Sequence, residues 1–147
     1  MTRMRWTTTW IVWALLSAFF AALTALLAKE GVAHVDSNLA TAVRTSVVLV
    51  LAWFIVFTFG RPHELSSLDR RTVGFLCASG VATGLSWLCY FRALALGPVS
   101  KVAPLDKLSV VFVLLLAWPV LGERITPGKV AGGALITAGA IVLAIAR

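Results

Sequence analysis

Five long apolar segments, separated by short polar connections, decide what this chain can fold into. A helix that crosses the ~30 Å hydrocarbon layer of a bilayer needs about 20 mostly apolar residues. Five stretches of about that length occur, at 7–28, 38–59, 72–94, 104–121 and 129–146. The connections between them are too short for a soluble domain. The sequence therefore predicts an all-α, polytopic membrane helical bundle, residues 1–147, with five transmembrane helices.

The composition excludes other classes of protein. The chain is 60% hydrophobic and 13% charged, whereas a soluble domain has roughly 45–50% apolar and about 25% charged residues. Six Trp and eight Phe argue against disorder. No phosphate-binding loop, hydrolase elbow or zinc-protease motif is present, and His34 and His63 lie far apart in loops. We therefore expect no enzyme, no cofactor and no metal site.

Turn residues support the predicted boundaries of the segments. Asp36 is placed to cap the helix over 38–59, and Gly60 is placed to end it. Gly97-Pro98 separates the third segment from the fourth, and Pro127 is placed in the first turn of the fifth.

The net charge of +7 indicates membrane topology and not nucleic-acid binding, because the basic residues flank apolar segments. Seven lie on the side of the N-terminus: Arg3, Arg5, Arg61, Arg70, Arg71, Arg124 and Lys129. Three lie on the other side, namely Lys29, Lys101 and Arg147, or six if Arg44, Arg92 and Lys107 at segment ends are included. The positive-inside rule places the N-terminus in the cytoplasm and the C-terminus across the cell (inner) membrane. The small bias leaves insertion in both orientations open, and so an antiparallel pair.

Arg44 is a charged residue inside a predicted span. It lies about six residues into the segment 38–59, roughly 9 Å below its start, and shares a helical face with Thr41, Thr45 and Val48. A charge at such depth marks a functional position by default. Two interpretations stay open: Arg44 lines a pathway or forms an ion pair, or its side chain extends to the interface.

Asp106 and Lys107 begin the fourth predicted span. If Pro104 is the first helical residue, Asp106 lies in the first turn, where the helix dipole stabilises an anion. Alternation of the span ends places Arg44, Arg92, Asp106 and Lys107 on one side of the bundle. Their excess positive charge favours an anionic or zwitterionic ligand over a lipophilic cation.

The third segment carries aromatic and small polar residues at helical spacing. Trp87 and Tyr90 lie beside Ser79, Thr83 and Ser86. Small polar side chains often join packed membrane helices. In a substrate path, the two aromatic residues would supply flat apolar walls with a polar group at the edge. Both roles stay open.

Glycines recur at helix-packing intervals, and such small residues let helices approach closely. They are Gly80 and Gly84, Gly128 and Gly132, and Gly139. The last segment is therefore a candidate dimerisation face.

Two stretches resemble a known family. The segment Gly84 to Pro98, with Tyr90, Ala93, Leu94 and Gly97, resembles the Y-x-x-A-L-x-x-G end of the third helix in EamA-type proteins of the drug/metabolite transporter superfamily. Leu121 to Thr126, followed by the glycine-rich stretch 132–139, resembles that family's L-G-E-R-x-T loop and last helix. The resemblance covers essentially the whole chain as one five-helix unit.

The resemblance implies a pair of chains. Most members of this family contain two such units in inverted orientation, and this chain has one, so a second copy would supply the other half, antiparallel in a homodimer.

The implied function is secondary transport of a small polar metabolite or drug-like solute by alternating access. The expected substrate pathway comprises Arg44, Trp87, Tyr90, Arg92, Asp106 and Lys107. The alternative is a non-transporting accessory or assembly subunit whose charges only anchor the spans at the interface.

Overall fold

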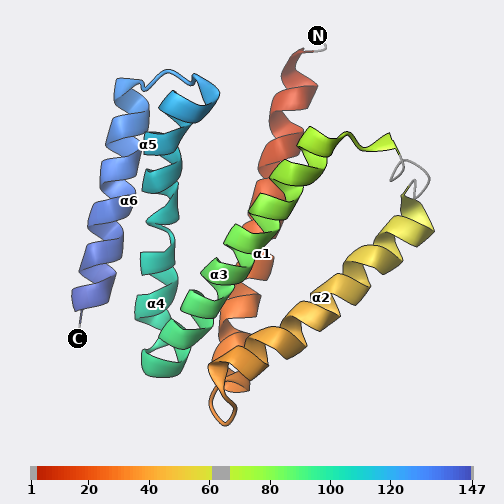
Figure 1. Ribbon diagram of the computed structural model, residues 1–147. Coiled ribbons are helices and arrows are strands. Elements are labelled where there is room, and N and C mark those ends of the chain that lie inside the picture. The colour runs from red at the N-terminus through yellow and green to blue at the C-terminus, as the bar shows by residue number, and fades with distance from the viewer. Residues whose placement is uncertain (1–2, 61–66, 147) are drawn as a thin grey trace. The chain divides into compact units, whose positions relative to one another are not determined.

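The computed structural model describes residues 3–60 and 67–146, and the side chains from residue 10 onward within these ranges. The helices are α1 (Arg3–Gly31), α2 (Ser37–Phe59), α3 (Arg70–Leu96), α4 (Val99–Asp106), α5 (Ser109–Leu121) and α6 (Pro127–Ile145) (Figure 1). Within these described residues there is no strand, so the all-α prediction is confirmed. Arg61 and Arg147, used in the topology prediction, lie outside the described residues, as do the side chains of Arg3 and Arg5.

Five helical segments of the described chain are long and apolar enough to cross a membrane, as predicted. They are Trp10–Gly31, Ser37–Phe59, Arg70–Leu96, Val99–Leu121 and Pro127–Ile145. Large apolar side chains along them, such as Phe54, Phe75 and Leu135, are more than half exposed. Apolar surface on this scale requires lipid or protein against it.

The helix ends follow from local hydrogen bonding. The Asp36 carboxylate accepts from the N–H groups of Asn38 (2.9 Å) and Leu39 (3.2 Å), which confirms the predicted cap of α2. The Gly60 N–H donates to the carbonyl of Val56 (3.0 Å) at the end of α2. At the start of α6 the Thr126 hydroxyl accepts from the N–H of Lys129 (3.3 Å). These bonds satisfy backbone groups that have no partner inside the helix.

Asp69 has the same role before α3. Its carboxylate accepts from the backbone N–H of Thr72 (3.3 Å). Hydrogen bonds from the side chain and then the backbone of Thr72 hold the pKa of Asp69 below its usual value. A carboxylate that accepts such bonds is stabilised in its charged form.

The fourth predicted span differs from the structure. Its helix begins earlier, at Val99 directly after Pro98, and it is broken at Lys107 and Leu108 into α4 and α5 (Figure 1). Pro104 lies inside α4 and lacks the N–H that would bond the carbonyl one turn earlier. At the break the backbone hydrogen bonds join residues three apart instead of four. The Lys107 N–H donates to the Pro104 carbonyl (3.1 Å), and the Leu108 N–H donates to the Leu105 carbonyl (3.0 Å). Asp106 therefore ends a helix, and the interpretation of it as a first-turn residue is wrong.

The chain divides into two compact units, Gly31–Ala95 and the combination of Met1–Glu30 with Leu96–Arg147. In the second, α6 lies beside both α4 and α5 (Figure 1). Gly133 is buried in α6, and a Cβ at this position would lie 3.1 Å from Cδ1 of Leu114 in α5. The Lys29 ammonium, near the end of α1, donates to the Gly97 carbonyl (3.0 Å).

The unit Gly31–Ala95 contains α2 and α3. Thr41, Phe91 and Leu94 are buried in it. The hydroxyls along these helices donate to carbonyls one turn back, from Thr41 to Ser37 (2.7 Å) and from Thr83 to Ser79 (2.9 Å). Such bonds let a hydroxyl lie in an apolar environment with its donor satisfied.

Candidate functional site

The Arg44 side chain lies against aromatic rings inside the unit Gly31–Ala95. Its guanidinium carbon, Cζ, is 4.2 Å from the centroid of the Trp87 ring and 5.4 Å from that of Phe91. Both distances fall within the ~6 Å range of cation–π attraction. Arg44 and Trp87 are half-buried, and Phe91 is buried. These contacts hold the Arg44 guanidinium of α2 against two rings of α3.

Helical spacing produces this cluster. Trp87 and Phe91 are four residues apart on α3, so their rings lie one above the other on one face. Arg44 is three residues after buried Thr41 on α2, on the face that carries Thr45. Thr45 donates its hydroxyl to the Thr41 carbonyl (2.7 Å). The polar face predicted for α2 therefore carries one charged group, Arg44. The hydroxyls of Thr41 and Thr45 on this face both donate to backbone carbonyls of α2 itself.

The charge of Arg44 is balanced by ring faces and not by a carboxylate. Among the described residues of Gly31–Ala95, no carboxylate lies within ion-pair distance of its guanidinium. Tyr90, half-buried on α3, lies three residues after Trp87 and therefore on the same side of the helix. A ring face attracts the positive charge but does not accept several N–H bonds as an oxygen anion does. The cluster of Arg44, Trp87, Tyr90 and Phe91, called the arginine–aromatic cluster below, can therefore offer N–H donors to an anion.

The structure joins part of the predicted pathway. Arg44 and Trp87 come together, with Tyr90 three residues from Trp87 on α3, whereas Arg92 is exposed on the same helix. Asp106 and Lys107 belong to the other unit, at the break between α4 and α5, where a carboxylate oxygen lies 3.6 Å from the ammonium. Both side chains are exposed, and Lys107 offsets the unfavourable position of a carboxylate at a helix C-terminus. That these two residues meet Arg44 remains a prediction.

Phe91 is a member of the cluster that the sequence analysis missed. The signal for it was present, because Phe91 lies four residues after Trp87 and three before the fully buried Leu94. An aromatic residue at this interval shares the face of Trp87.

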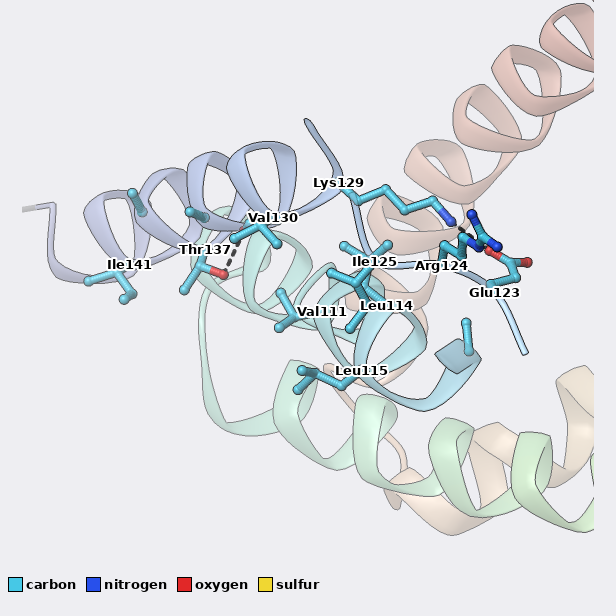
Figure 2. Close-up of a pocket in the computed structure, with 14 residues that line it drawn as sticks. Val111, Leu114, Leu115, Glu123, Arg124, Ile125, Lys129, Val130, Thr137 and Ile141 are labelled. Carbon is cyan, nitrogen blue, oxygen red and sulfur yellow. Dashed lines mark hydrogen bonds and ion pairs between the residues drawn. The ribbon is translucent and has the colours of Figure 1, made fainter. Parts of the chain in front are cut away.

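A second feature is a groove between α5 and α6, with a volume of about 480 Å³ (Figure 2). One end is charged and formed by Glu123, Arg124 and Lys129, with the Lys129 ammonium 2.8 Å from the Glu123 carboxylate. The rest is mainly apolar and is lined by Val111, Leu114, Leu115, Ala117, Ile125, Val130, Gly133, Ala134, Thr137, Ala138 and Ile141. The Thr137 hydroxyl donates to the Gly133 carbonyl (2.8 Å). The groove is therefore charged at one end and mainly apolar over the rest.

The glycines predicted to pack helices lie on open surface in the single chain. A Cβ added at Gly80, Gly84, Gly128, Gly132 or Gly139 would meet no atom within 4 Å. The close approach within the chain is instead at Gly133, beside Leu114. Dimerisation through the open glycines remains a prediction.

No metal site emerges from the described residues. Within residues 3–60 and 67–146, no three His, Cys, Asp or Glu side chains come together in a way that could hold a metal ion.

Five apolar helices, one of which carries a charged side chain against aromatic rings, define a multi-pass membrane protein in contact with lipid. Residues 8–145 match the EamA-like transporter family, and the chain belongs to that family. The resemblance drawn from the Tyr90 and Leu121–Thr126 motifs is therefore confirmed.

Three relatives carry the names of transporters. An uncharacterized transporter in the cobO 3' region of Sinorhizobium sp is 51% identical, over 92% of this chain and 96% of the relative. A probable 4-amino-4-deoxy-L-arabinose-phosphoundecaprenol flippase subunit, ArnF of Photorhabdus laumondii, is 32% identical over 82% of this chain and 85% of its own length.

The pseudopaline exporter CntI of Pseudomonas aeruginosa is 29% identical, over 78% of this chain but 39% of the exporter. The names are those of transporters and not of enzymes. No solved structure matches the chain.

Proposed function

We propose that the chain is a subunit of a secondary transporter in the cell (inner) membrane, where it moves a small polar metabolite or drug-like solute by alternating access. The observation that carries this proposal is the Arg44 guanidinium, held 4.2 Å from the Trp87 ring within the spans of an EamA-like transporter. A charge is costly inside a membrane helix, and most such charges lie on substrate or ion pathways.

The chemistry of the cluster favours a solute with an anionic group. Guanidinium N–H groups form paired hydrogen bonds with carboxylate or phosphate oxygens. The rings of Trp87 and Phe91 lie against the guanidinium, and Tyr90 adds a phenol hydroxyl to the same stretch of α3. Arg92 and the pair Asp106–Lys107 would extend the polar path.

We propose that two chains form the transport unit, as an antiparallel homodimer. The chain spans about two fifths of the exporter CntI, whereas ArnF, which it matches nearly end to end, is named as a subunit. Inverted repeats place a transport site at their interface. The small charge bias and the open faces at Gly80, Gly84, Gly128, Gly132 and Gly139 support this arrangement.

Labelling of single cysteines tests alternating access without a known substrate. Cys77 and Cys89 are free and exposed, so both are first replaced by Ser. Cysteine is then placed at Val48, one turn beyond Arg44, and at Phe57 as a control near the far end of α2. A membrane-impermeant maleimide should reach Val48→Cys from each face of the membrane in turn. If no reagent reaches Val48→Cys from either face, the accessory-subunit alternative is supported instead.

A reporter at the C-terminus tests the assembly. Dual insertion predicts activity of a cytoplasmic reporter and of a periplasmic reporter fused after the last residue. Activity on one side alone would exclude the antiparallel homodimer.

A further inference from the structure

We infer that the groove between α5 and α6 binds one membrane phospholipid with an anionic headgroup. The phosphate would lie at Arg124 and Lys129, and one acyl chain would lie along the apolar part of the groove. The volume of about 480 Å³ falls within the ~300–1,000 Å³ typical of ligand sites. This inference concerns a site apart from the arginine–aromatic cluster and does not depend on transport.

The charged end of the groove fits an anionic headgroup. Glu123, Arg124 and Lys129 lie together there (Figure 2), and two cations against one anion leave one net positive charge. Glu123 and Arg124 lie in the connection between α5 and α6, and Lys129 lies in the first turn of α6. The ends of membrane spans lie at the depth of the lipid headgroups. Arginine binds phosphate oxygens with two parallel N–H bonds. Basic pockets between membrane helices are known to bind anionic headgroups.

The apolar part of the groove has the length of one acyl chain. From Lys129 to Ile141 the lining of α6 extends over roughly 18 Å at 1.5 Å per residue. One leaflet contributes about half of the ~30 Å hydrocarbon layer. An acyl chain that starts beside Arg124 would therefore reach the middle of the bilayer. A helix of a second copy crosses both leaflets and would need contact along twice this length.

The lining suits a hydrocarbon chain in detail. Ala134 and Ala138 are small residues of the lining, whereas Gly133 lies close against Leu114 and joins the two helices. Thr137 is a polar member of this part, and its hydroxyl donates to the Gly133 carbonyl. The Thr137 hydroxyl is therefore already hydrogen-bonded where it faces the acyl chain. An unpaired polar group would be costly in such an apolar environment.

The headgroup contact is tested with spin-labelled lipids. The protein is placed in phosphatidylcholine vesicles with spin-labelled phosphatidylglycerol or phosphatidylcholine, and the immobilised fraction is measured by electron paramagnetic resonance. The wild type should prefer phosphatidylglycerol, and Arg124→Gln should lower that preference about fivefold. Arg70→Gln, outside the groove, should leave it unchanged. Equal immobilisation of the two lipids by the wild type would overturn the inference.

The acyl-chain contact is tested by filling the groove. Ala134→Phe should reduce immobilisation of both lipids, whereas Ala131→Phe, on the same helix outside the groove lining, should not. Helix content and elution volume confirm that both variants fold. Equal effects of the two variants would contradict the inference, as would a change in oligomeric state by Ala134→Phe without loss of lipid. Displacement of the lipid by soluble glycerol phosphate at equal concentration would show that the headgroup alone binds, which also overturns it.

Discussion

Two arginines in this chain occupy opposite kinds of environment. Arg44 lies inside a membrane span with its guanidinium against the rings of Trp87 and Phe91. Arg124 lies in a connection between spans, beside the ion pair of Glu123 and Lys129. The first charge is half-buried and stabilised by ring faces, and the second is stabilised by exposure and neighbouring charges. A half-buried charge without a carboxylate is the more expensive arrangement, so we expect function to depend most strongly on Arg44.

The largest effect should follow loss of the Arg44 charge. Arg44→Ala should reduce transport in reconstituted vesicles by about 100-fold, because the anionic solute would lose two charge-assisted hydrogen bonds, each contributing roughly 1.5–3 kcal/mol. Arg44→Lys keeps the charge without the paired N–H geometry and should retain an intermediate rate. Uptake is measured for a solute identified in a screen of labelled carboxylates and phosphates.

Arg71→Ala is the matched control for Arg44, because Arg71 also lies near an aromatic ring, Phe75 (5.9 Å), but is exposed at the start of α3. It should transport normally. Equal losses for Arg44→Ala and Arg71→Ala would assign the effect to net charge and remove the pathway role of Arg44.

The next largest effect concerns the ring that holds Arg44. Trp87→Ala should lower the rate or apparent affinity about fivefold, since a cation–π contact contributes roughly 0.5–2 kcal/mol. Trp87→Phe should lie between this variant and the wild type, because Trp is the best of the aromatic partners. If Trp87→Phe and Trp87→Ala behave alike, the ring face is not what positions the guanidinium.

A smaller effect is expected in the packing of α5 against α6. Gly133→Val places side-chain atoms against Leu114, already 3.1 Å from the position of a Cβ. Such overpacking costs about 1–3 kcal/mol and should lower the unfolding temperature in detergent. Gly132→Val is the control in the single chain, because its Cβ has open space. If Gly132→Val instead disrupts dimers while Gly133→Val does not, the glycine face predicted from the sequence is the dimer contact.

The smallest effect should come from Asp69. Its folded-state pKa is lowered by the hydrogen bonds from Thr72, so the folded state binds protons less readily than the unfolded state. The resulting stabilisation is fully present above the unfolded pKa and is lost as the pH falls through the folded pKa. Thermal unfolding of the wild type between pH 6 and 3 should therefore show a slight decrease that Asp69→Asn lacks. An identical pH dependence in both proteins would contradict this role.

The sequence predicted the helical segments well because membrane spans are specified locally. Length, apolar content and end signals such as Asp36 depend on neighbouring residues alone, and a bilayer enforces them uniformly. The structure differs from the prediction at the fourth span, for which the sequence predicted Pro104 as the first helical residue. Pro98 already caps the start of that helix, and Pro104 lies inside it, three residues before the break at Lys107 and Leu108.

The sequence by itself determined an all-α chain of five spans, the EamA-like family, and Arg44 as a charge inside a span. The tertiary structure decided what surrounds that charge, by bringing Trp87 and Phe91 of α3 onto the guanidinium of α2. It also decided that Gly133, and not Gly132, contacts Leu114, and that a groove opens between α5 and α6. Composition and spacing fix which residues share a helical face, whereas the partner of each face depends on how two helices pack together.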